Sequence, residues 1–444
     1  MIRLSKPRKT LGLALLWSVL VLFLCLLYVC LVPDEHQGRN VANPIEQSPK
    51  WFERLLAPMT AANRNEIDRV KVLSDVSATA NTDRRDAEVC HDFMSKNDPQ
   101  KIAMDTRGVM YAYLRQADSK LKETLMLIAA TGDPLQKATA LLLSAEIEQG
   151  NARESYFQGH PHCEINEACQ LELSRLQMAA SRATVDAVAK MAVYSKDPSL
   201  YATAFHACAS LPTKPDGFCT QVNAAQWASR DPENGIPWLH VLQELSQGSE
   251  GENQSTIADA LYKISKAKRF DAQTNILSQL PNQTLSESDS ISHARLQDLA
   301  FNITTKMPMP SYKPIINACK GSALNDGNRR AICEDLASQL QRENASMIEV
   351  ILSGKIGEQL GWDKVRTQSI QDDRDAFRGL MIDKANKALA QKRSQEDVMK
   401  LCLDDLGASR KFSQMNVEGE YKQYQEELTS YPVPRTELIR MGKK

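Results

Sequence analysis

The sequence predicts an all-α protein, in which an N-terminal transmembrane helix is followed by an α-solenoid of helical hairpins and a C-terminal helical subdomain. Three observations lead to this fold class. An uncharged apolar run fills residues 11–32. The rest of the chain is rich in Ala, Leu, Gln, Glu and Lys, which favour helices, and almost no segment alternates polar and apolar residues with a period of two. Asp-Pro dipeptides also recur at intervals close to 34 residues or twice that.

The apolar run predicts a retained membrane anchor. Its 22 residues carry no charge, and a bilayer core about 30 Å thick requires about 20 such residues as a helix. Four basic residues lie within residues 1–10, whereas Asp34 and Glu35 follow the run. Positive charge stays on the cytoplasmic side, so we expect a cytoplasmic tail at 1–10, a single pass through the inner membrane and a periplasmic bulk. A cleaved signal peptide is the alternative, but the run exceeds the roughly 7–15 apolar residues of such peptides and lacks an A-x-A-like cleavage site.

Composition limits the classes of function open to the chain. The formal net charge is −1, so no basic surface for nucleic acid is expected. The hydrophobic content of 42% and the charged content of 25% are ordinary for a chain that builds a core. The sequence contains no Gly-rich phosphate loop after a strand and no G-x-S-x-G element. We therefore predict no cofactor and no nucleic-acid partner.

Breaks in the helical pattern divide the chain after the anchor into four segments. Residues 33–48 combine Pro, Gly, Asn and charged residues without a period and predict a connector. Residues 49–270 are predicted to form a helical-repeat domain, and residues 271–428 a C-terminal helical region without a visible repeat. Residues 429–444 contain two prolines, at 432 and 434. They predict an extended tail, because a proline lacks the N–H group and restricts the residue before it.

The Asp-Pro dipeptides predict where helices start. They occur at 98–99, 133–134, 197–198 and 231–232, at intervals of 35, 64 and 34 residues. Asp supplies an N-cap oxygen and Pro fixes φ at the first helical position, so each dipeptide is expected to begin a helix. A period of this length is typical of stacked helix pairs, because one pair alone cannot bury its apolar face.

One helix pair has a more specific pattern. Pro232 and Asn234 precede Trp238, which opens an apolar helix, and a break containing glycine follows at 248–251. A second predicted helix follows and contains the small residues Ala258, Ala260 and Ala267. This pattern over residues 232–269 resembles a tetratricopeptide repeat, although the loop between the helices is longer than usual in that family. The resemblance implies an α-solenoid with a concave surface and implies no shared chemistry.

A concave solenoid surface suits a protein or peptide partner. The candidate residues for lining it are Tyr201, Trp227, Trp238 and His240, although a tryptophan at a helix start more often packs in a core. We therefore predict a membrane-anchored scaffold that binds a protein or peptide partner. A purely structural tether that holds a complex at a set distance from the bilayer is a further alternative.

Eight cysteines lie outside the apolar run, and their even number in an extracytoplasmic chain predicts disulfides. Sequence alone permits 105 pairings of eight cysteines. Short spacing favours three pairs, Cys163–Cys169, Cys208–Cys219 and Cys319–Cys333, which leaves Cys90 with Cys402. The alternative of eight reduced thiols would require the bulk of the chain to lie in the cytoplasm.

Two short motifs suggest metal chemistry and are better explained without it. Two nitrogens and two sulfurs are available for zinc from His160, His162, Cys163 and Cys169. However, so short a loop cannot readily place four ligands in a tetrahedral arrangement, and an oxidising compartment favours the disulfide. Asp373-Arg374-Asp375 matches the D-x-D motif of many Golgi transferases. It lies in a charged helical segment instead of at a strand end, which favours a solvated helix face. We predict no metal site.

An enzyme is the competing hypothesis. Glu154-Ser155-Tyr156-Phe157 is similar to the Glu-Ser-x-Phe opening of lytic transglycosylases, in which the glutamate is the general acid. That resemblance implies an enzyme acting on envelope polymer with Glu154 as its acid. The downstream Gly-Ala-x-Gly-Leu-Met-Gln element of that family is missing, so the hypothesis depends on whether Glu154 lies at the floor of a cleft or on an open helix face.

Overall fold

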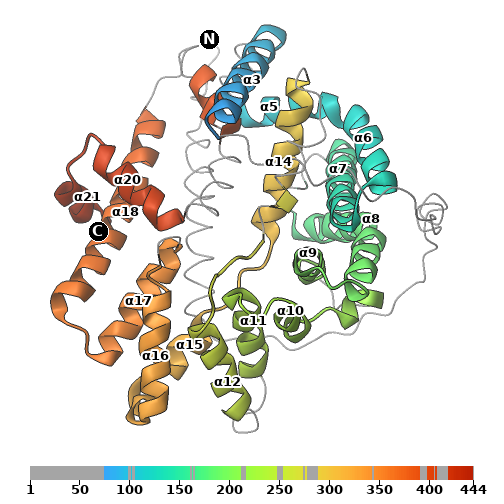
Figure 1. Ribbon diagram of the computed structural model, residues 1–444. Coiled ribbons are helices and arrows are strands. Elements are labelled where there is room, and N and C mark those ends of the chain that lie inside the picture. The colour runs from blue at the N-terminus through green and yellow to red at the C-terminus, as the bar shows by residue number, and fades with distance from the viewer. Residues whose placement is uncertain are drawn as a thin grey trace.

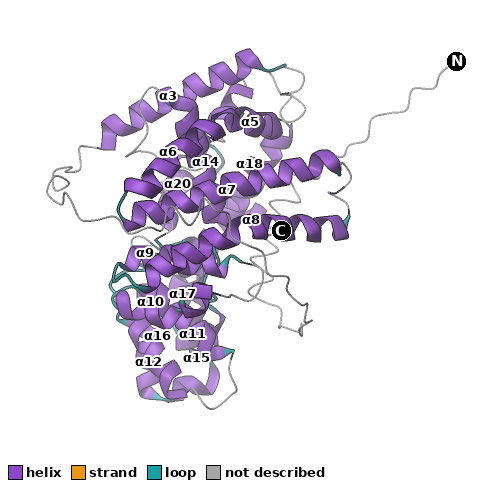
Figure 2. Ribbon diagram, turned by 90° about the vertical axis from the view of Figure 1, so that its right-hand side faces the viewer, coloured by secondary structure: helices purple, strands orange, loops and turns teal. Residues whose placement is uncertain are grey.

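The computed structural model describes residues 75–98, 102, 106–160, 163, 166–211, 217–247, 254–273, 276–277, 289–342, 345–390, 398–404, 406–407 and 419–443. The predicted cytoplasmic tail, transmembrane helix and connector therefore lie outside the described residues. Within them the fold is all-α and contains no strand, which confirms the all-α part of the prediction (Figure 2). No helix in these ranges is long and apolar enough to span a bilayer.

The first half of the described chain forms a series of helices joined by short connections. These are α3 (Asp75–Lys96), α5 (Thr106–Leu114), the 3-10 turn η1 (Arg115–Ala117), α6 (Asp118–Thr131), α7 (Pro134–Gly159), α8 (Glu167–Val193), α9 (Pro198–Ala209), η3 (Gly217–Gln221), α10 (Ala224–Arg230), α11 (Gly235–Ser246) and α12 (Gln254–Ser265).

The second half continues with helices of more varied length. These are α14 (Ser290–Lys306), α15 (Lys313–Ala318), the 3-10 turn η4 (Gly321–Asn325), α16 (Gly327–Gln339), α17 (Met347–Leu360), α18 (Lys364–Ala390), α20 (Glu420–Ser430) and α21 (Arg435–Gly442). Residues 398–404 are also helical.

Two of the Asp-Pro dipeptides begin helices as predicted. Asp133 caps α7 through its side chain, which accepts from Gln136 N, and Asp197 caps α9 in the same way. The prediction is wrong at Asp231, which follows α10 and does not cap α11. Its carboxylate is occupied by the Asn234 amide and the Arg269 guanidinium, and Asn234 caps α11 instead. Pro99 lies outside the described residues.

Consecutive helices pack against one another through most of the chain. Contacts join α6 to α7, α7 to α8, α8 to α9, α10 to α11, α11 to α12, α16 to α17 and α17 to α18. In Figure 1 these helices follow an arc that descends from α6 to α12 and ascends from α15 to α18. Helix α14 departs from this order, because it packs on α3 and α7.

The main core crosses the predicted boundary between residues 270 and 271. One cluster of buried apolar side chains is shared by helices from α6 to α17 and includes Leu261 of α12 and Leu299 of α14. A second cluster joins α3 to the helical residues 398–404, through Val89, Phe93 and Val398. Helix α3 and residues 398–404, which lie far apart in the sequence, therefore share a core.

All eight cysteines outside the apolar run form disulfides. The pairs are Cys90–Cys402, Cys163–Cys169, Cys208–Cys219 and Cys319–Cys333. These are the three local pairs and the remaining pair that the sequence predicts. The Cys90–Cys402 bond lies inside the core shared by α3 and residues 398–404, where both cysteines are buried.

The predicted extended tail at 429–444 is wrong. Helix α20 continues to Ser430, and α21 follows directly at Arg435. Pro434 occupies the position before the first helical residue, where a missing N–H group costs nothing because that group would have no partner in the helix. Burial then stabilises α21, since Leu438 is fully buried in a small core with Ala376 and Leu380 of α18.

Candidate functional site

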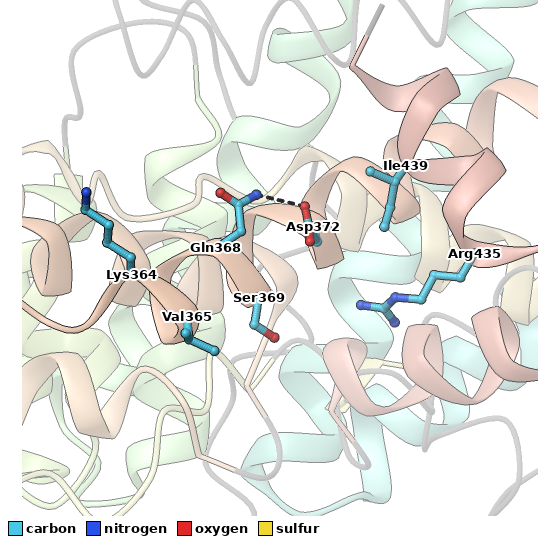
Figure 3. Close-up of a pocket in the computed structure, with 7 residues that line it drawn as sticks. All are labelled: Lys364, Val365, Gln368, Ser369, Asp372, Arg435 and Ile439. Carbon is cyan, nitrogen blue, oxygen red and sulfur yellow. Dashed lines mark hydrogen bonds between the residues drawn. The ribbon is translucent and has the colours of Figure 1, made fainter.

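A groove between α18 and α21 carries both apolar and charged groups. Its volume is about 530 Å³. Figure 3 shows five side chains of α18 and two of α21 along it, and the lining residues are Lys364, Val365, Gln368, Ser369, Asp372, Arg435 and Ile439. The α18 residues follow one face of the helix, because residues 364, 368 and 372 are four apart.

The groove combines apolar and charged side chains. Val365 is 81% exposed, and Ile439 of α21 also lines the groove. Gln368 donates to the Asp372 carboxylate at 2.9 Å, and the Lys443 ammonium lies 3.7 Å from the same carboxylate. Lys364 has no ion-pair partner among the residues that the structure describes. The groove therefore offers an exposed apolar surface next to a cation that is available to a ligand.

Close backbone contact and a buried carboxylate hold the walls of the groove together. A side chain at Gly442 would collide with the backbone of Asp375, so only glycine permits this approach of α21 to α18. Asp373 is 5% exposed and accepts from Arg435 of α21 and from the Tyr421 hydroxyl of α20. Burial and the hydrogen bond to Asp373 raise the pKa of the Tyr421 hydroxyl to about 12.

The prediction that Asp373-Arg374-Asp375 forms a solvated helix face is wrong. Asp375 is 5% exposed, like Asp373, and it accepts from Arg374. The Asp373 carboxylate joins α20 and α21 to α18, whereas the Asp375 carboxylate bonds to Arg374 of its own helix. No group of three or more possible metal ligands occurs within the described ranges.

Three of the four residues predicted to line a partner-binding surface are in the core. Tyr201 and Trp227 are fully buried, and His240 is 7% exposed. Trp238 is partly buried, and its indole N–H donates to the Pro232 carbonyl at 3.2 Å. The prediction is wrong for Tyr201, Trp227 and His240, because the faces of α9, α10 and α11 that carry them point into the main core.

The buried aromatic residues instead form one packed cluster with two histidines. The Phe205 ring lies 4.8 Å from His240 and 5.2 Å from Trp227, measured between ring centroids. His206 Nε2 donates to the Ala272 carbonyl at 2.9 Å. Burial lowers the pKa of His206 to about 4 and that of His240 to about 3. Both imidazoles are therefore neutral at pH 7.

Glu154 lies on an open helix face. It is exposed near the end of α7, and its carboxylate pairs with the Arg115 guanidinium. It does not line the groove between α18 and α21. The general acid of a polymer-cleaving enzyme must instead be enclosed by a cleft that holds the substrate. This geometry does not favour the enzyme hypothesis.

Comparison of the chain with protein-family models, with curated proteins and with solved structures finds no match in any of the three. The resemblance of residues 232–269 to a tetratricopeptide repeat therefore stays a prediction. What the structure adds is that α11 and α12, which span this segment, pack against each other.

Sequence reasoning missed the residues of the groove. The stripe of Lys364, Gln368 and Asp372 carries a weak signal, because polar residues four apart are ordinary on an exposed helix face. The second wall could not be predicted from a segment that was expected to be extended. Only the docking of α21 on α18 turns this ordinary helix face into a groove.

Proposed function

We propose that the protein is a membrane-anchored, extracytoplasmic helical scaffold that binds a protein or peptide partner. In this proposal, residues 11–32 anchor the chain, the consecutive helices form an α-solenoid, and the groove between α18 and α21 receives a segment of the partner. The observation that carries the proposal is this groove, in which Val365 is 81% exposed beside Lys364 and Arg435.

The packing order of the helices supports a solenoid scaffold. From α6 to α12 most helices contact the next one along the chain, and one core runs through all of them. Arrays of this kind derive stability from neighbouring units and present long surfaces to partners.

The disulfides support an oxidising compartment. All eight cysteines outside the apolar run are paired, and such bonds persist in the periplasm or outside the cell but are rare in the cytosol. The basic residues before the apolar run favour the same orientation.

The chemistry of the groove favours a short peptide segment with one aliphatic and one acidic side chain. Val365 and Ile439 supply apolar contact for the aliphatic group. The Lys364 ammonium is available for a carboxylate, whereas the Arg435 guanidinium already pairs with Asp373. A cation beside an apolar surface therefore selects acidic over basic segments.

The binding test uses two fluorescent hexapeptides, one alternating Leu with Glu and one alternating Leu with Lys, and fluorescence anisotropy with the detergent-solubilised full chain. We expect the acidic peptide to bind and the basic one not to. Val365→Glu should weaken binding at least tenfold, because it adds a carboxylate to the groove. Met381→Glu is the matched control, since Met381 is an exposed apolar residue on the same helix but outside the groove.

Equal binding by the two variants, or a preference for the basic peptide, would overturn the assignment of the groove. The anchor is tested separately with a reporter enzyme fused after Lys444 that is active only outside the cytoplasm. We expect activity in the wild type and its loss when the basic residues of the tail are moved to the other side of the run. A reporter that is active only in the cytoplasm would overturn the predicted topology.

A further inference from the structure

The Cys163–Cys169 disulfide differs from the other three in its accessibility. Cys163 is 1% exposed, but Cys169 is partly exposed at the start of α8. In each of the other three disulfides both cysteines are at most 4% exposed. Cys169 is therefore the more accessible residue of this pair for a thiol in solution.

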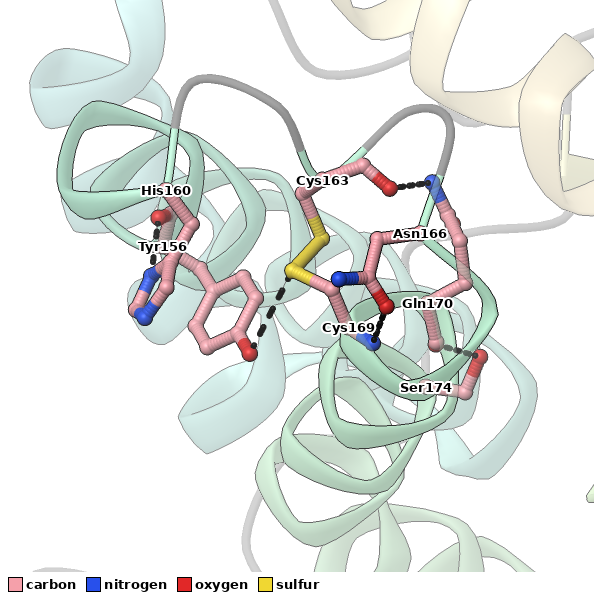
Figure 4. Close-up of a disulfide and its surroundings, with 7 residues drawn as sticks. All are labelled: Tyr156, His160, Cys163, Asn166, Cys169, Gln170 and Ser174. Carbon is pink, nitrogen blue, oxygen red and sulfur yellow. Dashed lines mark hydrogen bonds between the residues drawn. A yellow bond between two sulfur atoms is a disulfide. The ribbon is translucent and has the colours of Figure 1, made fainter.

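The surroundings of Cys169 can stabilise a thiolate. The Tyr156 hydroxyl of α7 donates to Cys169 Sγ at 3.6 Å, as Figure 4 shows. Cys169 is also the third residue of α8, a helix of 27 residues whose N-terminal end carries partial positive charge. Thiolates at helix N-termini are stabilised by this charge. The exposed Glu167 carboxylate opposes the effect, but solvent screens it.

Hydrogen bonds hold the two cysteine positions in place without help from the sulfur bond. The Cys169 N–H donates to the Asn166 side chain at 3.2 Å, and the Gln170 amide donates to the Cys163 carbonyl at 2.9 Å. The Tyr156 ring is also fixed, because it stacks on His160 with ring centroids 4.2 Å apart. The site can therefore keep its shape when the disulfide opens.

We propose that Cys163–Cys169 is a redox-active disulfide that exchanges with a dithiol protein, with Cys169 as the sulfur that is attacked. This activity goes beyond the scaffold role and does not depend on it. The other three disulfides hold the fold and take no part in the exchange.

The exchange proceeds in two balanced steps. A thiolate of the dithiol partner attacks Cys169 Sγ, the Cys163–Cys169 bond breaks, and the Cys163 thiolate leaves and takes up a proton. The second partner thiolate then attacks the partner sulfur of the mixed disulfide and releases the Cys169 thiolate. The partner ends as a disulfide, and both cysteines end reduced. The contact from Tyr156 assists the second step, because a stabilised thiolate leaves faster.

The first experiment compares the reduction rates of the four disulfides in the folded full chain. The detergent-solubilised protein is treated with dithiothreitol at pH 7, quenched with acid, alkylated and analysed by peptide mapping. We expect Cys163 and Cys169 to be reduced at least tenfold faster than the other pairs, with an unchanged circular dichroism spectrum. Cys208–Cys219 is the matched internal control, because it also closes a short loop but both its cysteines are buried. Reduction of all four pairs at one rate would overturn the proposal.

Two sets of variants test which sulfur reacts and how. Cys163→Ser leaves Cys169 free, and we expect it to react with 5,5′-dithiobis(2-nitrobenzoate) at least tenfold faster than Cys169→Ser, which leaves Cys163 free. Adding Tyr156→Phe to Cys163→Ser should slow the reaction of Cys169 with the same reagent about threefold, as expected for the loss of one hydrogen bond. The urea midpoint should not change. Equal reactivity of the two thiols would overturn the role of Cys169. An unchanged rate in Tyr156→Phe would overturn the role of the hydroxyl.

Discussion

The cluster around Trp227 and the groove between α18 and α21 differ in the residues that build them and in how far those residues are buried. The first is rich in aromatic and histidine side chains, and these are buried in a core shared by helices from α6 to α17. The second is built from ordinary polar residues of one helix and a short C-terminal helix with its own small core. The aromatic and histidine residues that stand out in the sequence therefore pack in a core in this protein, whereas ordinary polar residues line the exposed groove.

The two regions also differ in how they are held together. Around Trp227, large apolar side chains interlock over several helices, so a defect should spread through the whole array. At α21, close backbone approaches at Gly379 and Gly442 and a small apolar core hold a single helix in place. The ion pair between Arg435 and Asp373 adds to them. A defect there should stay local. Three predictions test this difference.

The largest effect is expected from Trp227→Ala. Removal of a fully buried tryptophan leaves a cavity and should lower the free energy of unfolding by about 3–5 kcal/mol. Urea unfolding followed by circular dichroism measures the change. Hydrogen exchange should increase from α6 to α12, because these helices share the core. Increased exchange confined to α10 would contradict a cooperative array.

Acid should destabilise the same region through its histidines. The folded protein holds His206 and His240 neutral, with pKa values of about 4 and about 3, whereas an unfolded histidine has a pKa near 6.5. Below pH 6.5 the unfolded state binds protons that the folded state does not, so stability is complete above pH 6.5 and falls toward pH 4. The loss for His206 alone is on the order of 3 kcal/mol.

The control for this pH dependence is His240→Phe. Among the residues that the structure describes, His240 Nε2 has no hydrogen-bond partner, so phenylalanine removes the titration without removing a bond seen at that atom. Urea midpoints at pH 7.5, 5.5 and 4.5 should fall less steeply in the variant than in the wild type. Identical slopes would show that acid acts elsewhere in the molecule.

The smallest effect on global stability is expected from Gly442→Ala, although it should abolish the groove. The added methyl group would collide with the Asp375 backbone and displace α21 from α18. Hydrogen exchange over residues 435–443 should increase. The change in the urea midpoint should correspond to a decrease of less than about 1 kcal/mol in the free energy of unfolding. Gly327→Ala is the matched control, since nothing lies within 4 Å of a side chain at that position. Unchanged exchange in α21 would contradict the close approach.

Local physical chemistry explains most of what could be predicted. Asp133 and Asp197 cap helices because the capping oxygen and the N–H groups it accepts from lie within one turn of chain. Three disulfides could be predicted from spacing, because a short loop keeps its two cysteines within reach of each other. Cys90 and Cys402 followed only because they were the last two.

Predictions failed where a residue's role depends on a partner far along the chain. Asp231 has the local pattern of a helix start, but Arg269 and Gln273, which lie 38 and 42 residues later, donate to its carboxylate. The two prolines before α21 suggest an extended tail, but burial of Leu438 against α18 outweighs that preference. In both cases a contact between distant segments decides the local structure.

The sequence by itself determined that the described chain is helical and where α7 and α9 begin, and the spacing of its cysteines favoured the pairing that the structure shows. These properties depend on interactions within a few turns of chain or on a simple count. The tertiary structure alone decided that Tyr201, Trp227 and His240 are buried, that α21 forms, and that a groove lies beside it. The physical reason is that burial depends on which helix faces pack together, and these contacts are made between residues that are tens to hundreds of positions apart.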